Sequence, residues 1–253
     1  MDRQPLLERR VLITGAGAGI GARTACEVVE RGGRVAVFDL DGEAAMRTAQ
    51  SLGADKAISL QGDVTDQEAI EGVLDAMTVA WGGIDDLVNN VGIYDHGPLL
   101  ELSIAQWQRV FEANFMAPIA VSCAAVRRMK AGGSIVNVSS VLGQVSAPGR
   151  GPYCVSKAAL ISLTKMQAVE WAQRDIRVNA IAPGYITSKE TDRLIQSGSI
   201  DYAGICRRTP LGRFGTQEEV AQGICFLLDP AQASYITGHV LEVSGGWTAY
   251  GFV

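Results

Sequence analysis

A tyrosine and a lysine lie four residues apart in the segment Tyr153-Cys-Val-Ser-Lys157. On a helix, this spacing puts both side chains on one face. A phenol, with a reference pKa of about 10, is a poor base at neutral pH, but an ammonium group beside it stabilises the phenolate and lowers that pKa. The pair could therefore move a proton during catalysis. Two unrelated residues on an exposed helix face are the competing interpretation, because Y-x-x-x-K is common by chance.

Ser140 precedes the tyrosine by thirteen residues and directly follows an apolar run that is expected to be a strand. Sites in α/β proteins collect at strand ends, and a serine hydroxyl there can hydrogen-bond the oxygen of a carbonyl or an alcohol. Ser139 is the competing serine, and a turn or cap is the competing role. Asn114 lies inside a long predicted helix, where asparagine is unfavourable and usually faces solvent.

A glycine-rich segment, Gly15-Ala-Gly-Ala-Gly19-Ile20-Gly21, follows the first predicted strand and opens a helix. Bare N–H groups at a helix N-terminus attract phosphate, and glycine lets a pyrophosphate come close. Asp39 ends the next strand about 20 residues on, where a carboxylate accepts hydrogen bonds from the adenosine ribose and repels a 2′-phosphate. Because no Lys or Arg occupies 16–18 or 40–42, the pattern favours NAD over NADP. A plain turn, with Asp39 as a helix cap, is the alternative.

Short β-branched runs alternate with longer helical segments along the chain. Strands are predicted at 11–14, 34–38, 57–61, 84–89, 134–139, 177–182 and 240–243. Helices are predicted at 20–31, 42–52, 67–81, 104–129, 153–173 and 217–228, whereas 189–208 is expected to be polar and irregular. The strands are continuously apolar, as in a parallel sheet covered on both faces. We therefore expect a single α/β domain over residues 1–253, with a doubly wound parallel sheet of about seven strands and helices on both faces.

The composition is typical of a globular protein. Of the 253 residues, 47% are hydrophobic and 19% charged, which is too apolar for intrinsic disorder, and the net charge of −5 argues against a general nucleic-acid surface. The longest apolar stretch, 115–126, is too short to span a bilayer, and the polar N-terminus lacks the core of a signal peptide. Five scattered cysteines and two distant histidines predict neither a disulfide framework nor a metal site. We expect a cytoplasmic protein without membrane or nucleic-acid partners.

The glycine spacing is unusual for a dinucleotide fingerprint. Gly15, Gly19 and Gly21 follow Gly-x-x-x-Gly-x-Gly rather than G-x-G-x-x-G. Together with the later tyrosine–lysine pair, this spacing resembles the short-chain dehydrogenase/reductase family, and the resemblance extends over residues 7–247. It implies a Rossmann-type fold, a nicotinamide dinucleotide cofactor and oxidoreductase activity.

The resemblance also assigns catalytic roles. It implies that Ser140, rather than Ser139, holds the substrate oxygen and that Tyr153 transfers the proton. Lys157 would also bind the nicotinamide ribose, and Asn114 would hold a water that links the lysine to solvent.

Segments after the third, fourth and sixth predicted strands match the family's cofactor-contacting positions. Their competing roles are a helix N-cap, a strand-ending turn and a Pro-Gly turn. Val91 replaces the usual alanine, Ser188 stands where threonine is usual, and Ser244 replaces an aspartate, but none of these departures removes a catalytic group. The implied cofactor-binding residues are Gly15, Gly19, Ile20, Gly21, Asp39, Asp63, Val64, Asn90, Gly92, Tyr153, Lys157, Pro183, Gly184, Ile186 and Ser188.

The substrate is less constrained by the sequence than the cofactor. A lid is expected at about 187–208, and its charges, together with nearby aromatic residues, favour a polyol, a sugar or a cyclic alcohol. Besides Ser140 and Tyr153, the expected pocket residues are Tyr94, His96, Gln144 and Tyr185. Family members are commonly tetramers, so a homotetramer is expected, and the aromatic tail 247–253 could pack on its own or on a neighbouring subunit.

The main hypothesis is an NAD-dependent oxidoreductase that interconverts a secondary alcohol and its ketone, with Tyr153 as the general acid/base. One alternative is an NADPH-dependent reductase of ketones or of 3-oxoacyl groups on a carrier protein, against which Asp39 argues. An alternative from another class is a non-catalytic dinucleotide sensor.

Overall fold

The computed structural model describes residues 4–130 and 132–250. The strands are β1 (Arg10–Thr14), β2 (Arg34–Asp39), β3 (Ala57–Gln61), β4 (Asp86–Asn89), β5 (Ser134–Val138), β6 (Arg177–Pro183) and β7 (Val240–Val243). The α-helices are α1 (Gly19–Glu30), α2 (Gly42–Leu52), α3 (Gln67–Trp81), α4 (Ile104–Phe111), α5 (Ala117–Arg128), α6 (Gly151–Trp171), α7 (Lys189–Gln196), α8 (Tyr202–Arg208) and α9 (Gln217–Leu228). Shorter helical turns are the π-helical η1 (Glu112–Met116) and the 3₁₀ turns η2 (Val141–Gly143) and η3 (Ala172–Arg174).

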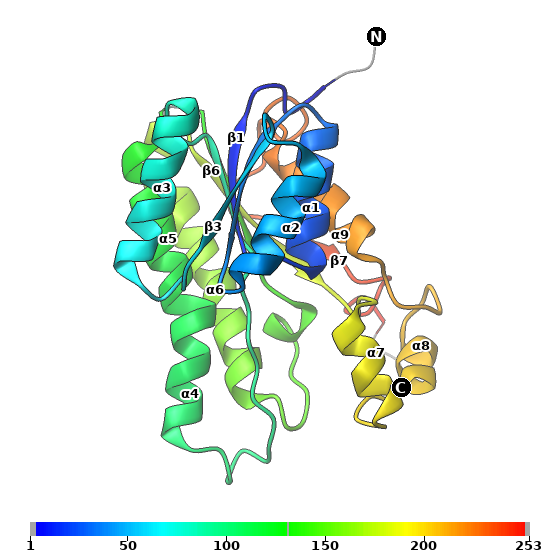
Figure 1. The fold of residues 1–253 in the computed structure, drawn as a ribbon. Coiled ribbons are helices and arrows are strands. Elements are labelled where there is room, and N and C mark those ends of the chain that lie inside the picture. The colour runs from blue at the N-terminus through cyan, green and yellow to red at the C-terminus, as the bar shows by residue number, and fades with distance from the viewer. Residues whose placement is uncertain (1–3, 131, 251–253) are drawn as a thin grey trace.

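The strands form one parallel sheet in the order β3-β2-β1-β4-β5-β6-β7. The order reverses between β1 and β4, where Leu12 pairs with Leu87. At such a reversal the loops after the two strands diverge and leave a crevice beyond their carboxyl ends. In Figure 1, α4 and the α7–α8 pair extend beyond this end of the sheet. The predicted fold class, a doubly wound parallel sheet of about seven strands with helices on both faces, is confirmed.

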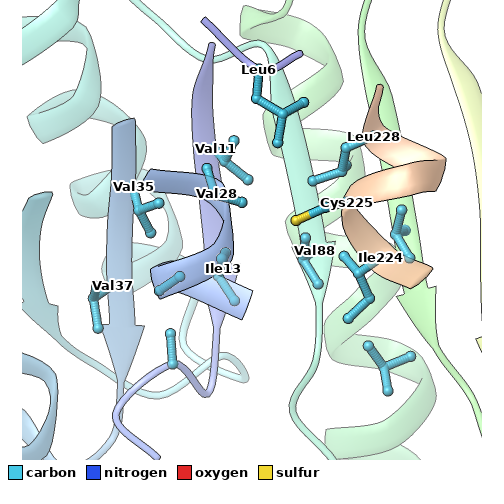
Figure 2. Packing of buried hydrophobic residues seen from close by; sticks show 14 of the residues in the cluster. Leu6, Val11, Ile13, Val28, Val35, Val37, Val88, Ile224, Cys225 and Leu228 are labelled. Carbon is cyan, nitrogen blue, oxygen red and sulfur yellow. The ribbon is translucent and has the colours of Figure 1, made fainter. Parts of the chain in front are cut away.

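Alternate residues of each strand point to opposite faces of the sheet. Val11 and Ile13 of β1 belong to a buried cluster with α1, α2 and α9, whereas Leu12 belongs to a second cluster with α3, α5 and α6. Figure 2 shows the first cluster, in which Ile224 of α9 lies near Val88 of β4. Because apolar helices cover both faces, the strands can be apolar throughout.

Several of the connections that lead from a helix to the next strand contain a glycine with a positive φ angle. Gly32, Gly82 and Gly132 have φ angles of 91°, 79° and 89°, in the left-handed region that favours glycine. Each lies between a helix and the following strand. The chain can therefore leave each helix and return directly to the sheet.

The segment 189–208, expected to be irregular, instead contains α7 and α8. Ser188 and Asp201 cap these helices by accepting hydrogen bonds from the backbone N–H groups of Thr191 and Gly204. The prediction was wrong because helices of eight and seven residues are too short to show a clear apolar period. Local capping and contact with the rest of the fold stabilise them instead.

The predicted long helix at 104–129 is helical to Arg128 but is not uniform. The π-helical turn η1 separates α4 from α5, and Pro118 lies in the first turn of α5, where a missing N–H is tolerated. By length and hydropathy, the stretch Ile104–Arg128 could cross a membrane, but 56% of its apolar window is buried in the fold, which is typical of a core helix. The other predicted boundaries agree with the observed ones to within two residues, the usual uncertainty at element ends.

Candidate active site

Two cavities lie along the carboxyl end of the sheet and share Asn90 and Gly92 in their walls. The first, of about 640 Å³, is lined by Asp39, Asp63 and Val64 from the ends of β2 and β3. The second, of about 370 Å³, is lined by residues that follow β5 and β6 and by α6. The segments predicted to hold the two halves of a dinucleotide therefore lie along one edge of the sheet.

The glycine-rich turn between β1 and α1 is tightly folded and open on one side. A Cβ atom on Gly21 would lie 2.3 Å from the Gly15 carbonyl oxygen, so only glycine fits there. Asn90 donates hydrogen bonds from Nδ2 to the Thr14 and Gly15 carbonyls at 3.0 Å each, which fixes the turn against β4. A Cβ on Gly19 would meet nothing within 4 Å, and Gly19 lines the second cavity. An open turn at the N-terminus of α1 can accept a pyrophosphate.

Asp39, the last residue of β2, and Asp41, two residues later, have different roles. The carboxylate of Asp39 accepts hydrogen bonds from the backbone N–H groups of Gly17 at 2.8 Å and Asp41 at 3.0 Å, and it lies on the wall of the first cavity. Asp41 is the N-cap of α2 and accepts from the Ala44 N–H. The capping role considered for Asp39 therefore belongs to Asp41, and Asp39 is available to a ribose.

Asp63 and Val64, after β3, also lie on the wall of the first cavity. Asp63 accepts hydrogen bonds from the N–H and hydroxyl groups of Thr65, at 2.9 and 2.8 Å. The N-cap of α3 is Asp66, not Asp63.

Ser140 and Ser139 point to different partners. Ser140 lines the same two cavities as Tyr153, and its Oγ accepts a hydrogen bond from the Leu142 N–H at 3.1 Å. The Ser139 hydroxyl donates to the Lys157 carbonyl at 2.9 Å, which joins β5 to α6. The structure therefore brings Ser140 together with the tyrosine and gives Ser139 a structural contact.

Lys157 lies one helical turn after Tyr153, with its Nζ 5.8 Å from the centre of the tyrosine ring. The ammonium donates to the Val138 carbonyl at 2.7 Å, and within residues 4–130 and 132–250 no carboxylate pairs with it. A Cβ on Gly92 would lie only 3.0 Å from Nζ, so glycine makes room for the ammonium. Burial lowers the pKa of Lys157 to about 8.

The pKa of the Tyr153 phenol differs from the expectation. Burial raises this pKa, and the hydrogen bond with Ser140 and the charge of Arg150 act in the opposite direction. The expected lowering by Lys157 is not among these effects, because the ammonium is directed at the Val138 carbonyl. In this structure, therefore, the phenol is the stable form at neutral pH.

Asn114 lies in the π-helical turn η1 and is fully buried. Its Oδ1 accepts from the Ile93 N–H and its Nδ2 donates to the Ile93 carbonyl, both at 2.8 Å, while Nδ2 also donates to Ser156 Oγ at 3.0 Å. The side chain thus holds the segment after β4 against α6 rather than facing solvent.

The segment after β6 forms the far wall of the second cavity. Pro183, Gly184, Ile186 and Ser188 all line it, together with Ile20 from the start of α1. The Gly184 N–H donates to the Val243 carbonyl at 2.9 Å, and a Cβ on Gly184 would lie 3.0 Å from Ser244 Cα. The backbone is therefore held where it can border a bound ring.

These residues fit a nicotinamide dinucleotide. The open glycine turn suits the pyrophosphate, Asp39 suits one ribose, and Lys157, whose ammonium gives one of its three donors to Val138, suits the other. Among the described residues, no group of three or more His, Cys, Asp or Glu side chains could hold a metal ion.

A third cavity of about 200 Å³ adjoins the second beyond Ser140 and Tyr153. Of the predicted substrate residues, Tyr94 and Tyr185 line it. His96 packs edge-on against Tyr94, with ring centres 4.9 Å apart, and burial and the nearby Arg150 lower its pKa. Neither His96 nor Gln144, at the end of η2, is among the lining residues.

Sequence analysis missed three lining residues, Val141, Leu142 and Arg150, and it did not single out Thr191, Leu194 and Ile200, which lie within the segment expected to be a lid. The i, i+3 spacing of Thr191 and Leu194 could have indicated the inner face of a helix. In the tail, Trp247 packs on Tyr185 of the same chain with ring centres 5.2 Å apart, and the last three residues of the tail, 251–253, lie outside the described residues.

Comparisons with known proteins agree with this geometry. A family model described as "Enoyl-(Acyl carrier protein) reductase" matches residues 15–248. Cis-4-hydroxycyclohexanecarboxylate dehydrogenase of Sinomonas cyclohexanicum is 40% identical over 248 residues, which are 96% of this chain and 97% of that protein. The 3-oxoacyl-(acyl-carrier-protein) reductase FabG of Thermotoga maritima is 39% identical over 246 residues, 95% of this chain and 98% of that protein.

The crystal structure of a short-chain type dehydrogenase/reductase from Mycobacterium marinum superimposes with a TM-score of 0.91 at 35% identity, covering 98% of this chain and 99% of that one. One curated relative is much longer. The chain spans 45% of the length of an uncharacterised short-chain type dehydrogenase/reductase, y4vI of Sinorhizobium fredii, to which it is 37% identical over 97% of its own length.

Proposed function

Because the chain belongs to the short-chain dehydrogenase/reductase family, whose members bind a nicotinamide dinucleotide, we propose that it is an NAD-dependent oxidoreductase that interconverts a secondary alcohol and its ketone. One observation carries the proposal: Ser140 and Tyr153 lie together at the junction of two cavities and line both of them, with Lys157 one turn along α6.

The residues take the following roles in oxidation. Tyr153 accepts the proton of the substrate hydroxyl in its phenolate form and, in the reverse reaction, donates the proton from the phenol to the ketone oxygen, while Ser140 donates a hydrogen bond to the same oxygen. Lys157 stabilises the charge on the tyrosine and binds a ribose hydroxyl with its remaining donors. Asn114 positions the segment after β4, and a water at this turn would return the proton to solvent. When bound, the nicotinamide ring accepts the hydride from the carbinol carbon.

The proposed preference for NAD over NADP rests on Asp39. Its carboxylate lies on the wall of the first cavity, and the neighbouring Leu40 and Asp41 bring no positive charge to it. A 2′-phosphate there would meet a carboxylate without a cation to offset the repulsion.

The alternative is an NADPH-dependent reductase of ketones or of 3-oxoacyl groups on a carrier protein. The similarity to FabG supports it, at 39% identity over nearly the whole chain. The similarity to a hydroxycyclohexanecarboxylate dehydrogenase, at 40% identity, supports oxidation of a cyclic secondary alcohol. We favour oxidation of a secondary alcohol with NAD over reduction with NADPH, because the Asp39 carboxylate would repel the 2′-phosphate of NADPH.

We further propose that the protein is a cytoplasmic homotetramer acting on a small molecule. Exposed apolar side chains on the α4–η1 part of the long helix and on the helix of the tyrosine support an interface between copies across α4, η1 and α6. They include Ile104, Met116, Val155, Met166 and Val169.

The test is a screen for NADH formation over cyclic alcohols, hydroxy acids, polyols and sugars, repeated with NADP. The proposal predicts oxidation of at least one secondary alcohol with a higher kcat/KM for NAD than for NADP. Preference for NADP with reduction of 3-oxoacyl thioesters would favour the alternative, and tight NADH binding without turnover of any compound would favour a sensor.

A further inference from the structure

Arg150 gives the substrate cavity a single positive charge. It is the residue just before α6, three positions before Tyr153, and it lines the cavity of about 200 Å³ that adjoins Ser140 and Tyr153. It is the one charged residue among the described residues that line this cavity.

The guanidinium of Arg150 has no anionic partner in the described part of the chain. Arg109, from α4 at the same end of the molecule, pairs with Asp95, and Arg213 pairs with Glu219, but no ion pair involves Arg150. Its guanidinium carbon instead lies 5.3 Å from the centre of the Tyr94 ring, a contact that holds the group in place and leaves its donors free. A half-buried, unpaired arginine beside the reacting groups is a ready partner for an anion.

The rest of the cavity wall combines aliphatic side chains with the hydroxyl-bearing side chains of Tyr94, Tyr185 and Thr191. Charged residues of α7, such as Asp192 and Arg193, are exposed on its outer face, and the residues that face inward are Thr191 and Leu194. The remaining apolar lining comes from Val141, Leu142, Ile186 and Ile200. Thr191 Oγ1 already donates to the Ile186 carbonyl, and the aliphatic side chains of the wall suit a hydrocarbon skeleton.

We propose that Arg150 binds an anionic group of the substrate, which is a hydroxy acid with a compact apolar skeleton. The hydroxyl group lies at Ser140 and Tyr153, and a carboxylate or sulfonate lies at the guanidinium. The charge of Arg150 reaches the reacting groups, since it acts to lower the pKa of both Tyr153 and Tyr185 against the effect of burial. The proposal rests on the proposed function for its placement of the hydroxyl group.

Binding of unreactive analogues tests the proposal without turnover. The probes are cyclohexanecarboxylate, cyclohexanesulfonate and cyclohexanecarboxamide, titrated by calorimetry into the protein saturated with NADH. We expect both anions to bind more tightly than the neutral amide. Arg150→Met should weaken anion binding by about 30-fold or more and leave amide binding within about 3-fold, whereas Arg150→Lys should recover part of the loss. The ratio of the dissociation constants of cyclohexanecarboxylate and cyclohexanesulfonate shows which acid the site prefers.

Arg47→Met is the matched control, because Arg47 is an exposed arginine on α2 that pairs with Glu43 away from the cavity. It should leave all three affinities unchanged. Equal binding of the anions and the amide to the unaltered protein, or an equal loss of all three in Arg150→Met, would overturn the proposal.

Turnover of 4-hydroxycyclohexanecarboxylate and its amide separates this inference from the proposed function. Anion binding through Arg150 without oxidation of any alcohol would leave the inference in place and contradict the proposed function. Oxidation of neutral alcohols with no preference for the acid, at a rate that Arg150→Met does not change, would contradict the inference and leave the proposed function in place.

Discussion

The Lys157 ammonium donates a hydrogen bond to the Val138 carbonyl, 2.7 Å away at the end of β5. The lysine is almost fully buried, and within the described ranges no carboxylate pairs with it. A buried, unpaired charge destabilises a folded protein, and burial lowers the pKa of this group to about 8. The site therefore keeps its cation at the expense of stability.

This arrangement predicts a specific pH dependence of stability. Below about pH 8, Lys157 is charged in both states and the full penalty of burying the charge applies. Between about pH 8 and the ordinary lysine pKa of 10.5, the unfolded chain binds the extra proton, so the free energy of unfolding rises with pH, by about 3 kcal/mol over the whole window.

The measurement is urea unfolding of the cofactor-free protein and of Lys157→Met from about pH 7 to about pH 10. As the pH rises across this range, the free energy of unfolding of the unaltered protein should increase relative to that of Lys157→Met. Lys165→Met, an exposed position on the same helix, controls for the loss of a lysine. Parallel curves for the protein and Lys157→Met would contradict the prediction.

Adjacent serines should separate catalysis from stability. Ser140→Ala removes the hydroxyl group that lines the same cavities as Tyr153 and should lower kcat by about 100-fold. Ser139→Ala removes the hydrogen bond to the Lys157 carbonyl and should lower stability by about 1 kcal/mol while keeping most of kcat. Steady-state kinetics and denaturant unfolding of both variants check this, and a larger loss of kcat in Ser139→Ala would show that the roles are reversed.

Asp39 and Asp41 can be compared in the same way to test the preference for NAD over NADP. Asp39→Ser removes the carboxylate on the wall of the first cavity, so the ratio of kcat/KM for NAD over NADP should fall by about 100-fold as the repulsion of a 2′-phosphate is lost. Asp41→Ser keeps a side chain that can cap α2 and should leave the ratio unchanged. An unchanged ratio in Asp39→Ser would mean that the preference is set elsewhere.

The sheet and the glycine turn could be predicted because their signals are local. Apolar runs as short as Val11 to Thr14 are explained by a strand covered on both faces, and Gly21 is required by a contact within its own turn. Ser140 and Asp39 could be identified as candidates because each lies at the end of a strand, where the topology collects functional groups.

Other features depend on contacts between distant parts of the chain. That Asn114 is buried follows from its bonds to Ile93 and Ser156, which no local pattern indicates. That Arg150 is unpaired can be seen only when every neighbouring side chain is in place. The direction of the Lys157 ammonium, toward Val138, likewise follows from how α6 packs on β5.

Replacement of the proposed proton carrier is the most direct test of the account. Tyr153→Phe removes one hydroxyl group from a partly buried ring and leaves the ring in place. The account predicts that kcat falls by about 1,000-fold, while the NADH dissociation constant, measured by fluorescence titration, stays within about 2-fold. Tyr235→Phe, at a fully exposed position, should change neither quantity. Turnover by Tyr153→Phe at the rate of the unaltered protein would contradict the account.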